Sequence, residues 1–277
     1  MSLVESGWLE NNINNTKILD CSWHMPDINR NGYNEYLKEH IPGSIFFDLD
    51  KYSKNNTDLP HMLPDPIVWE QIVSSLGISN NDKIIIYDYS DVISSCRCWY
   101  NFVYFGHDPN LVSVLNGGLK KWKMEGRPIT DNKTKIFKSN YKSSENKNLV
   151  KDINQINQNI KQEKFIVVDA RSRERFEGKV PDPRKNVRSG SIPNSLCLPF
   201  KEIINGDNTF KNIDILSKKF NEIINDKDNN IVFSCGSGVT ACVLALAYSL
   251  VNNKYSPTIY DGSWAEYGKL KKNEKIY

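Results

Sequence analysis

Short apolar runs rich in β-branched residues alternate along the chain with segments of helical periodicity. In the second half, residues 164–169, 195–200 and 230–234 have the composition of buried strands and are bounded by turn residues. Residues 214–224 carry apolar side chains at helical spacing, and residues 239–252 are apolar almost all round, which is typical of a buried helix. This alternation predicts an α/β fold with mainly parallel sheets covered by helices.

The two halves of the chain repeat each other in the same order. KILDCSW (17–23), HIPGSIFFDLD (40–50) and KIIIYDYSD (83–91) are followed in the second half by FIVVDARS (165–172), GSIPNSLCLPF (190–200) and NIVFSCGSG (230–238). The offset is nearly constant: it is 149 from Asp20 to Asp169 (169 − 20) and 147 from Ile84 to Ile231 (231 − 84). A duplicated domain explains this register. We therefore predict domains at 1–135 and 149–277, joined by a polar connector at 136–148.

Composition and charge exclude several classes of protein. With 39% hydrophobic residues, the 277-residue chain has enough apolar material for packed cores and is not generally disordered. Its 36 basic and 33 acidic side chains are too evenly balanced for a general binder of nucleic acid or of membrane surfaces. No apolar stretch approaches the ~18 residues of a membrane span. The start, MSLVESGWLE, shows no signal or transit peptide, so we expect a cytoplasmic protein and leave a mitochondrial location open.

The cysteine pattern favours free thiols over disulfides or a metal centre. The six cysteines are Cys21, Cys96, Cys98, Cys197, Cys235 and Cys242. The chain is far longer than a disulfide-stapled small domain, which indicates a reducing compartment. Cys96 and Cys98 lack a second pair at the spacing of zinc ligands, so no metal site is predicted.

The segment IVFSCGSGVTAC (231–242) carries the strongest chemical signal. A strand is expected to end at Ser234, directly before Cys235, and glycines at 236 and 238 allow a tight loop and close approach of a ligand. A helix then begins, with Thr240 in its first turn. Backbone N–H groups at such a loop and helix start favour anions, so they would stabilise a thiolate or persulfide on Cys235.

Three alternatives compete with a reactive Cys235. An inert buried cysteine beside packing glycines is the simplest. A nucleotide cradle lacks both G-x-G-x-x-G and G-x-x-x-x-G-K-[ST] here. A C-x5-R phosphatase needs an arginine where this chain has Ala241. The strand, cysteine, glycine loop and helix together favour a functional cysteine.

Histidine placement predicts a site that uses both domains. All four histidines lie in the first half of the chain, so Cys235 has no histidine partner from its own half. We therefore expect an active site in the cleft between the two copies. The matching strand end of the first copy has Asp88 and Tyr89 and no glycine-rich loop, which predicts an inactive first domain.

Five motifs together resemble the tandem-rhodanese sulfurtransferase family. They are CGSGVTAC (235–242), HIPG (40–43), HMLP (61–64), LNGGLKKW (115–122) and DGSWAEYG (261–268), and the likeness extends from Leu3 to about Gly268. CGSGVT resembles the 3-mercaptopyruvate branch, because the thiosulfate-specific branch carries basic residues just after the cysteine. The resemblance implies two rhodanese-like α/β domains and sulfur transfer from 3-mercaptopyruvate to a Cys235 persulfide, with release of pyruvate. A thiol acceptor, typically thioredoxin, then takes the sulfur. No metal or organic cofactor is implied.

The resemblance also implies roles for individual residues. In ERFEGKVPDPR, Arg175 and Arg184 match two arginines that bind the substrate carboxylate and keto oxygen. Ser237, His61 and Asp50 match a trio suited to polarising the keto group or protonating the departing enolate. The remaining substrate-binding positions are Gly236, Gly238, Val239, Thr240 and, in a secondary role, Arg97. The alternative for this segment is a solvated basic surface, which is favoured more for Arg171, Arg173 and Arg188 than for the pair.

Two other functions stay open at this point. The first is a thiosulfate:cyanide sulfurtransferase, which the neutral residues after Cys235 disfavour, since a dianionic donor should prefer cations there. The second is a persulfide relay without small-molecule activity, which the arginine pair disfavours because a relay needs no carboxylate clamp.

Overall fold

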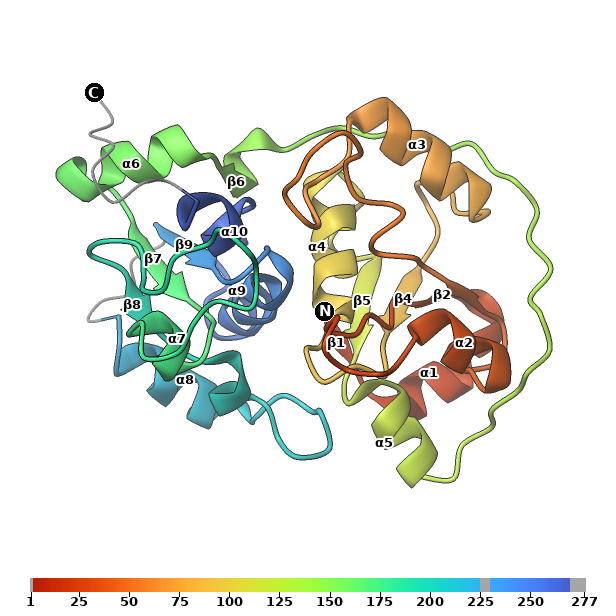
Figure 1. Ribbon diagram of the computed structural model, residues 1–277. Coiled ribbons are helices and arrows are strands. Elements are labelled where there is room, and N and C mark those ends of the chain that lie inside the picture. The colour runs from red at the N-terminus through yellow and green to blue at the C-terminus, as the bar shows by residue number, and fades with distance from the viewer. Residues whose placement is uncertain (1, 225–229, 270–277) are drawn as a thin grey trace. The chain divides into compact units, whose positions relative to one another are not determined.

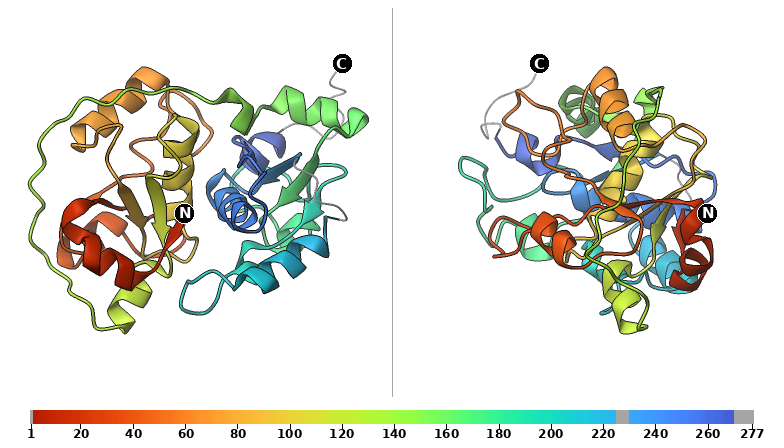
Figure 2. Two further views of the ribbon diagram at one scale, coloured as in Figure 1. Left: turned by 180° about the vertical axis from the view of Figure 1, so that it is seen from behind. Right: turned by 90° about the vertical axis from the view of Figure 1, so that its right-hand side faces the viewer.

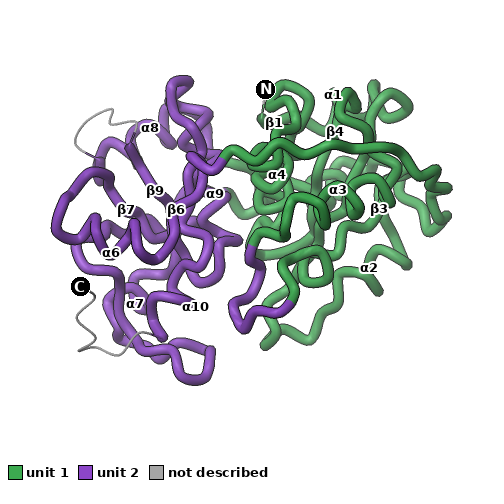
Figure 3. Tube along the Cα trace, turned by 90° about the horizontal axis from the view of Figure 1, so that it is seen from above, with its two compact units in different colours: residues 1–55, 63–146, 205–210 green, residues 56–62, 147–204, 211–277 purple. Residues whose placement is uncertain are grey.

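The computed structural model describes residues 2–224 and 230–269 and divides into two compact units (Figure 3). Unit 1 comprises Met1–Asn55, Leu63–Asn146 and Asn205–Phe210. Unit 2 comprises Asn56–Met62, Lys147–Ile204 and Lys211–Tyr277. The main division, between Asn146 and Lys147, falls within the connector predicted at 136–148. Two short segments are exchanged between the units. Residues 56–62 belong to unit 2 although the chain on both sides of them belongs to unit 1, and residues 205–210 belong to unit 1 although the chain on both sides of them belongs to unit 2.

Unit 1 is built on a five-stranded parallel sheet of order β1-β5-β4-β2-β3 (Figure 1). Its strands are β1 (Leu3–Val4), β2 (Lys17–Asp20), β3 (Ser44–Phe46), β4 (Ile84–Tyr87) and β5 (Val112–Leu115). Its helices are α1 (Ser6–Asn12), the 3₁₀ turn η1 (Ile13–Asn15), α2 (Gly32–Lys38), α3 (Pro66–Ser75), α4 (Ser95–Tyr104) and α5 (Gly118–Met124).

Unit 2 is built on a second five-stranded parallel sheet. Its strands are β6 (Val150–Lys151), β7 (Ile166–Asp169), β8 (Leu196–Cys197), β9 (Ile231–Ser234) and β10 (Ile259–Tyr260). Its helices are η2 (Lys147–Leu149), α6 (Ile153–Gln162), α7 (Arg173–Phe176), η3 (Phe200–Ile203), α8 (Ile213–Asn221), α9 (Val239–Val251) and α10 (Ser263–Tyr267). The order β6-β10-β9-β7-β8 matches unit 1 strand for strand, which confirms the duplication and the α/β fold class.

Helices pack on both faces of the sheet in unit 2 (Figure 2). On one face, Ile156 of α6 and Trp264 of α10 pack against Val232 of β9. On the other face, Phe233 contacts the rings of Phe220 from α8 and Tyr248 from α9. Because successive strand residues point to opposite faces, β9 is buried on both. This double burial is the reason for the continuous apolar run in the sequence.

A buried aspartate ends the corresponding strand of each unit, β2 in unit 1 and β7 in unit 2, but the two carboxylates have different partners. Asp169, which ends β7, accepts the backbone N–H of Arg171 at 2.9 Å and pairs with its guanidinium at 2.7 Å. Arg171 is 4% exposed and lies over the Trp264 ring at 4.5 Å, so the alternative of a solvated surface charge does not hold for this residue. In unit 1, Asp20 accepts the backbone N–H of Ser22 at 2.9 Å, and serine stands where unit 2 has the arginine.

Asp20 is buried, and none of the described cations is paired with it as Arg171 is paired with Asp169. Burial raises the pKa of Asp20 from 3.8 to about 7, against the lowering effect of the hydrogen bonds from Ser22. The folded protein therefore holds a proton that the unfolded chain releases above pH 3.8.

We expect Asp20→Asn to gain stability relative to the wild type as the pH rises from 3.8 to about 7. Over this range the contribution of Asp20 to the wild-type free energy of unfolding should fall by up to about 1.4 kcal/mol per pH unit, because the folded wild type must keep the Asp20 carboxyl protonated and the asparagine variant has no such proton to keep. Denaturant unfolding of both proteins at the two ends of the range measures the difference. Equal pH dependence in the two proteins would show that Asp20 does not titrate in this way.

Candidate functional site

The Cys235 loop joins β9 to α9 and is fastened to the start of α10. The backbone N–H of Cys235 donates to Ser263 Oγ at 3.2 Å, and its carbonyl accepts from the Trp264 N–H at 3.0 Å. Gly238 closes the loop with a φ of 77°, a conformation that favours glycine. Cys235 is 2% exposed and lies four residues before Val239, where α9 begins. The predicted sequence of strand, cysteine, tight loop and helix is confirmed.

Two guanidinium groups lie against Gly236, directly after Cys235. From the position that a Cβ on Gly236 would occupy, Arg184 Nη2 is 3.1 Å away and Arg175 Nη2 is 3.6 Å away. A side chain at position 236 would therefore press on Arg184. The absence of a side chain at Gly236 therefore leaves room for both guanidinium groups beside the cysteine loop. Both arginine side chains are about one-quarter exposed, at 23% and 24%.

Ser237 and His61 share a hydrogen bond beside this loop. The Ser237 hydroxyl and His61 Nδ1 are 3.0 Å apart, and both residues are buried. His61 belongs to the segment 56–62, which is part of unit 2 (Figure 3). The structure thus brings these two predicted residues together.

The other predicted residues divide between the units. Unit 2 holds Gly238, Val239 and Thr240 at the start of α9. Asp50 and Arg97 lie in unit 1. Asp50 accepts from the Trp23 indole N–H at 3.0 Å, and Arg97 is a fully buried residue of α4 whose guanidinium lies 5.8 Å from the centre of the Tyr100 ring.

A carboxylate occupies the matching loop of unit 1. Asp88 follows β4 as Cys235 follows β9, and it accepts the backbone N–H groups of Ser90 at 3.1 Å and Ser94 at 3.2 Å. The hydroxyl of Ser95 donates to it at 2.6 Å. Burial raises the pKa of Asp88. Unit 1 therefore has a carboxylate, Asp88, at the position of the Cys235 thiol in unit 2. This carboxylate accepts hydrogen bonds from the N–H and O–H groups of its own loop.

Asp182 is a residue of this site that the sequence did not single out. Its carboxylate is 1% exposed and accepts from Arg175 Nη2 at 2.8 Å and from the Arg184 backbone N–H at 3.0 Å. The only hint in the sequence was an acid placed between two prolines in PDPR, seven residues after Arg175 and two before Arg184.

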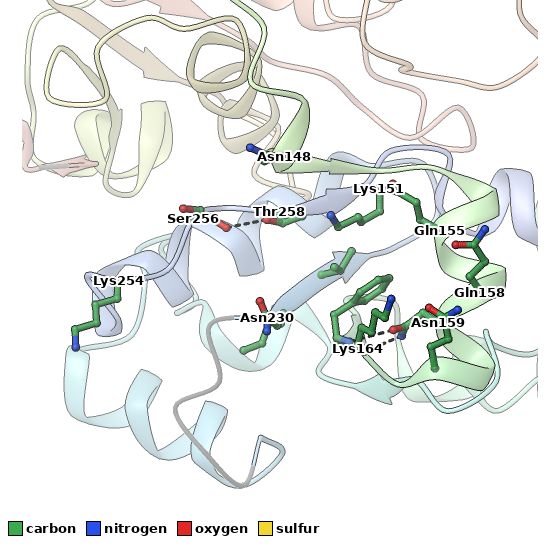
Figure 4. Close-up of a pocket in the computed structure, with 14 residues that line it drawn as sticks. Asn148, Lys151, Gln155, Gln158, Asn159, Lys164, Asn230, Lys254, Ser256 and Thr258 are labelled. Atoms are coloured by element: carbon green, nitrogen blue, oxygen red, sulfur yellow. Dashed lines mark hydrogen bonds between the residues drawn. The ribbon is translucent and has the colours of Figure 1, made fainter.

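An open pocket of about 580 Å³ lies elsewhere in unit 2 (Figure 4). Lys151, Lys164, Lys254 and several amide side chains line it, together with Asn230 and Ile231 at the start of β9. Cys235 follows the opposite end of that strand, roughly 13 Å away along its length. This pocket is therefore separate from the cysteine loop.

Among the described residues, no helix is both long and apolar enough to cross a membrane. Within the same residues, no group of three or more histidine, cysteine, aspartate or glutamate side chains is placed to hold a metal ion.

A family model described as a rhodanese-like domain matches the chain twice, at residues 5–125 and 152–270. The chain belongs to the rhodanese family. Both matches coincide with the repeated units of the fold, and the tandem-rhodanese resemblance is thereby confirmed.

Rhodanese relatives place the chain among the sulfurtransferases. Over 288 residues it is 37% identical to thiosulfate/3-mercaptopyruvate sulfurtransferase 1, mitochondrial, of Arabidopsis thaliana, covering 96% of this chain and 75% of the relative. It is 34% identical to the thiosulfate sulfurtransferase of Bos taurus, covering 96% and 91%. The crystal structure of SseA from Escherichia coli, described as a 3-mercaptopyruvate sulfotransferase, superposes with a TM-score of 0.84 at 29% identity, covering 95% and 99%. The protein is a sulfurtransferase of the 3-mercaptopyruvate/thiosulfate type.

Proposed function

We propose that the chain takes sulfur from 3-mercaptopyruvate, forms a persulfide on Cys235 and releases pyruvate. The Cys235 thiolate attacks the donor sulfur, so that an S–S bond forms as the C–S bond breaks. The electron pair of the broken bond leaves with the carbon fragment as the enolate of pyruvate, and one proton converts this enolate to pyruvate. In this proposal the Ser237 hydroxyl, which shares a hydrogen bond with His61 Nδ1, polarises the keto oxygen or passes on that proton.

The second half of the reaction needs a thiol acceptor. A thiolate of the acceptor attacks the outer sulfur of the persulfide, which forms an acceptor persulfide and returns Cys235 as a thiolate. Thioredoxin, or another thiol partner, fills this role in the proposal. No metal or organic cofactor takes part in either half. Since one relative is named mitochondrial, a cytoplasmic location stays a prediction. The roles of Asp50 and Arg97 also stay predictions.

The observation that carries the choice of donor is the arginine pair beside Gly236. Arg175 and Arg184 present guanidinium groups suited to a carboxylate and a keto oxygen, within a few ångströms of the cysteine loop. The loop itself, from Gly236 to Thr240, has no cationic side chain, and Asp182 offsets part of the charge of the two arginines beside it, which disfavours a compact dianion such as thiosulfate.

The wild-type protein is therefore expected to prefer 3-mercaptopyruvate over thiosulfate. The two kcat/KM values come from pyruvate release with a dithiol acceptor and from thiocyanate formation with cyanide. We expect a preference of about tenfold or more, the size of one charge-assisted hydrogen bond. A preference for thiosulfate would favour the thiosulfate:cyanide activity. Turnover of neither donor, with a persulfide accepted only from a protein partner, would favour the relay.

A further inference from the structure

The loop after α7 places one carboxylate between the two arginines. Asp182 Oδ2 accepts from Arg175 Nη2 at 2.8 Å. Asp182 Oδ1 accepts from the backbone N–H of Arg184 at 3.0 Å and from its Nη1 at 3.3 Å. A single side chain therefore ties both guanidinium groups, and through them the whole 175–184 segment, to the place beside Gly236.

The same carboxylate changes the charge of the site. Burial alone would oppose its ionisation, but the hydrogen bonds and charges of Arg175 and Arg184 outweigh burial and lower the pKa of Asp182. Asp182 is thus ionised near neutral pH. Two guanidinium charges and one carboxylate charge sum to a single positive charge (+2 − 1 = +1).

We propose that Asp182 is a positioning and specificity-determining residue, which holds Arg175 and Arg184 beside Gly236 and leaves between them the one net positive charge that suits a monocarboxylate donor. This inference rests on the proposed function. It extends that function by assigning the charge balance of the donor site to a residue that need not touch the donor.

The physical reason is that two guanidinium groups placed together repel each other and lose side-chain entropy when they are held still. Asp182 offsets the repulsion and fixes both groups with only a few of their N–H donors, so that others stay available to a ligand. An asparagine of the same size would accept one of these bonds through its oxygen. Its amide nitrogen would face an N–H group of one arginine, with which it cannot form a hydrogen bond, so that arginine would be released. The two guanidinium groups would then carry a net charge of +2.

The test compares Asp182→Asn and Asp182→Glu with a control, Glu177→Gln. Glu177 lies in the same segment and pairs with Lys179 at 2.5 Å. Its replacement by glutamine removes one negative charge, as Asp182→Asn does. For Asp182→Asn we expect kcat/KM for 3-mercaptopyruvate to fall by roughly ten- to a hundredfold, mainly through KM, because ground-state binding of the carboxylate is weakened. Thiosulfate should lose less or gain, so the ratio of the two donors should shift by about tenfold or more toward thiosulfate.

Two comparisons separate a role in specificity from one in folding. Asp182→Glu keeps the charge and should return the donor ratio toward the wild-type value, while Glu177→Gln should leave the ratio unchanged. A uniform loss with both donors, or an unchanged ratio in Asp182→Asn, would overturn the inference and assign Asp182 to the stability of the loop alone.

A second readout does not depend on turnover. Alkylation of Cys235 by iodoacetamide should be slowed by pyruvate in the wild type, and in Asp182→Asn the protection should shift from pyruvate to the dianion sulfate. If the wild type turns over no 3-mercaptopyruvate, the proposed function fails, and the protection pattern still tests the charge balance. If the wild type is active and the protection pattern is the same in both proteins, only the inference about Asp182 fails.

Discussion

Replacing Cys235 with serine is expected to abolish sulfur transfer from 3-mercaptopyruvate, with a loss of at least about 1,000-fold, or roughly 4 kcal/mol of the activation barrier. A serine hydroxyl stays protonated near neutral pH, is a weak nucleophile and cannot carry a persulfide. The fold should survive, because the contacts that fasten position 235 to Ser263 and Trp264 are made by its backbone. Pyruvate release by the purified variant, with circular dichroism to verify folding, is the measurement.

Cys242→Ser provides the matched control. Cys242 is also buried on α9, and its Sγ donates to the Gly238 carbonyl at 3.1 Å, a bond that a hydroxyl can keep. This variant should retain most of the wild-type activity. Activity that survives in Cys235→Ser, or an equal loss in Cys242→Ser, would contradict the assignment of the nucleophile.

Arg175→Lys and Arg184→Lys should each lower kcat/KM for 3-mercaptopyruvate by about ten- to a hundredfold, or roughly 1.5–3 kcal/mol. Lysine keeps the positive charge but cannot make the planar, two-bond contact of a guanidinium. Neither lysine reproduces the bonds to Asp182, so the partner arginine is loosened as well. Steady-state kinetics with 3-mercaptopyruvate measures both effects.

Arg173→Lys is the matched control, because it makes the same arginine-to-lysine change in the same segment at a residue that we do not expect to bind the donor. Arg173 is half exposed and pairs with Glu202 at 2.7 Å. Its replacement by lysine should leave kcat/KM within about twofold of the wild type, since exposed ion pairs contribute little. If kcat/KM in Arg175→Lys and Arg184→Lys changes as little as in Arg173→Lys, Arg175 and Arg184 are surface charges and do not bind the donor carboxylate.

Local signals in the sequence were sufficient for the elements and for the cysteine loop. The run at 230–234 and the apolar segment at 239–252 became β9 and α9, because strand length, glycine and helix periodicity act over a few residues. The repeat predicted that both domains share one fold, and the two sheets have the same strand order, although the order itself was not predicted from the sequence. The helix expected at 214–224 begins at Ile213 and ends at Asn221.

Contacts between distant segments could not be predicted in this way. Arg171 looks like its basic neighbours in sequence, but the strand end places it against Asp169 and Trp264 in the core of unit 2. The assignment of residues 56–62 to unit 2 leaves no periodic signal in the sequence, and the resemblance to a known family, not the local pattern, brought His61 and Ser237 together. Asp182 was missed because its role depends on two partners in space, although both lie within seven residues of it.

The central claim is that Cys235 carries the transferred sulfur, and mass spectrometry of the protein after brief treatment with 3-mercaptopyruvate tests it most directly. Without an acceptor, each chain should gain one sulfur atom, which peptide mapping should locate at Cys235, and should release one equivalent of pyruvate. Addition of a thiol acceptor should remove that sulfur. Sulfur found on another cysteine, or pyruvate released without any added sulfur on Cys235, would contradict the account.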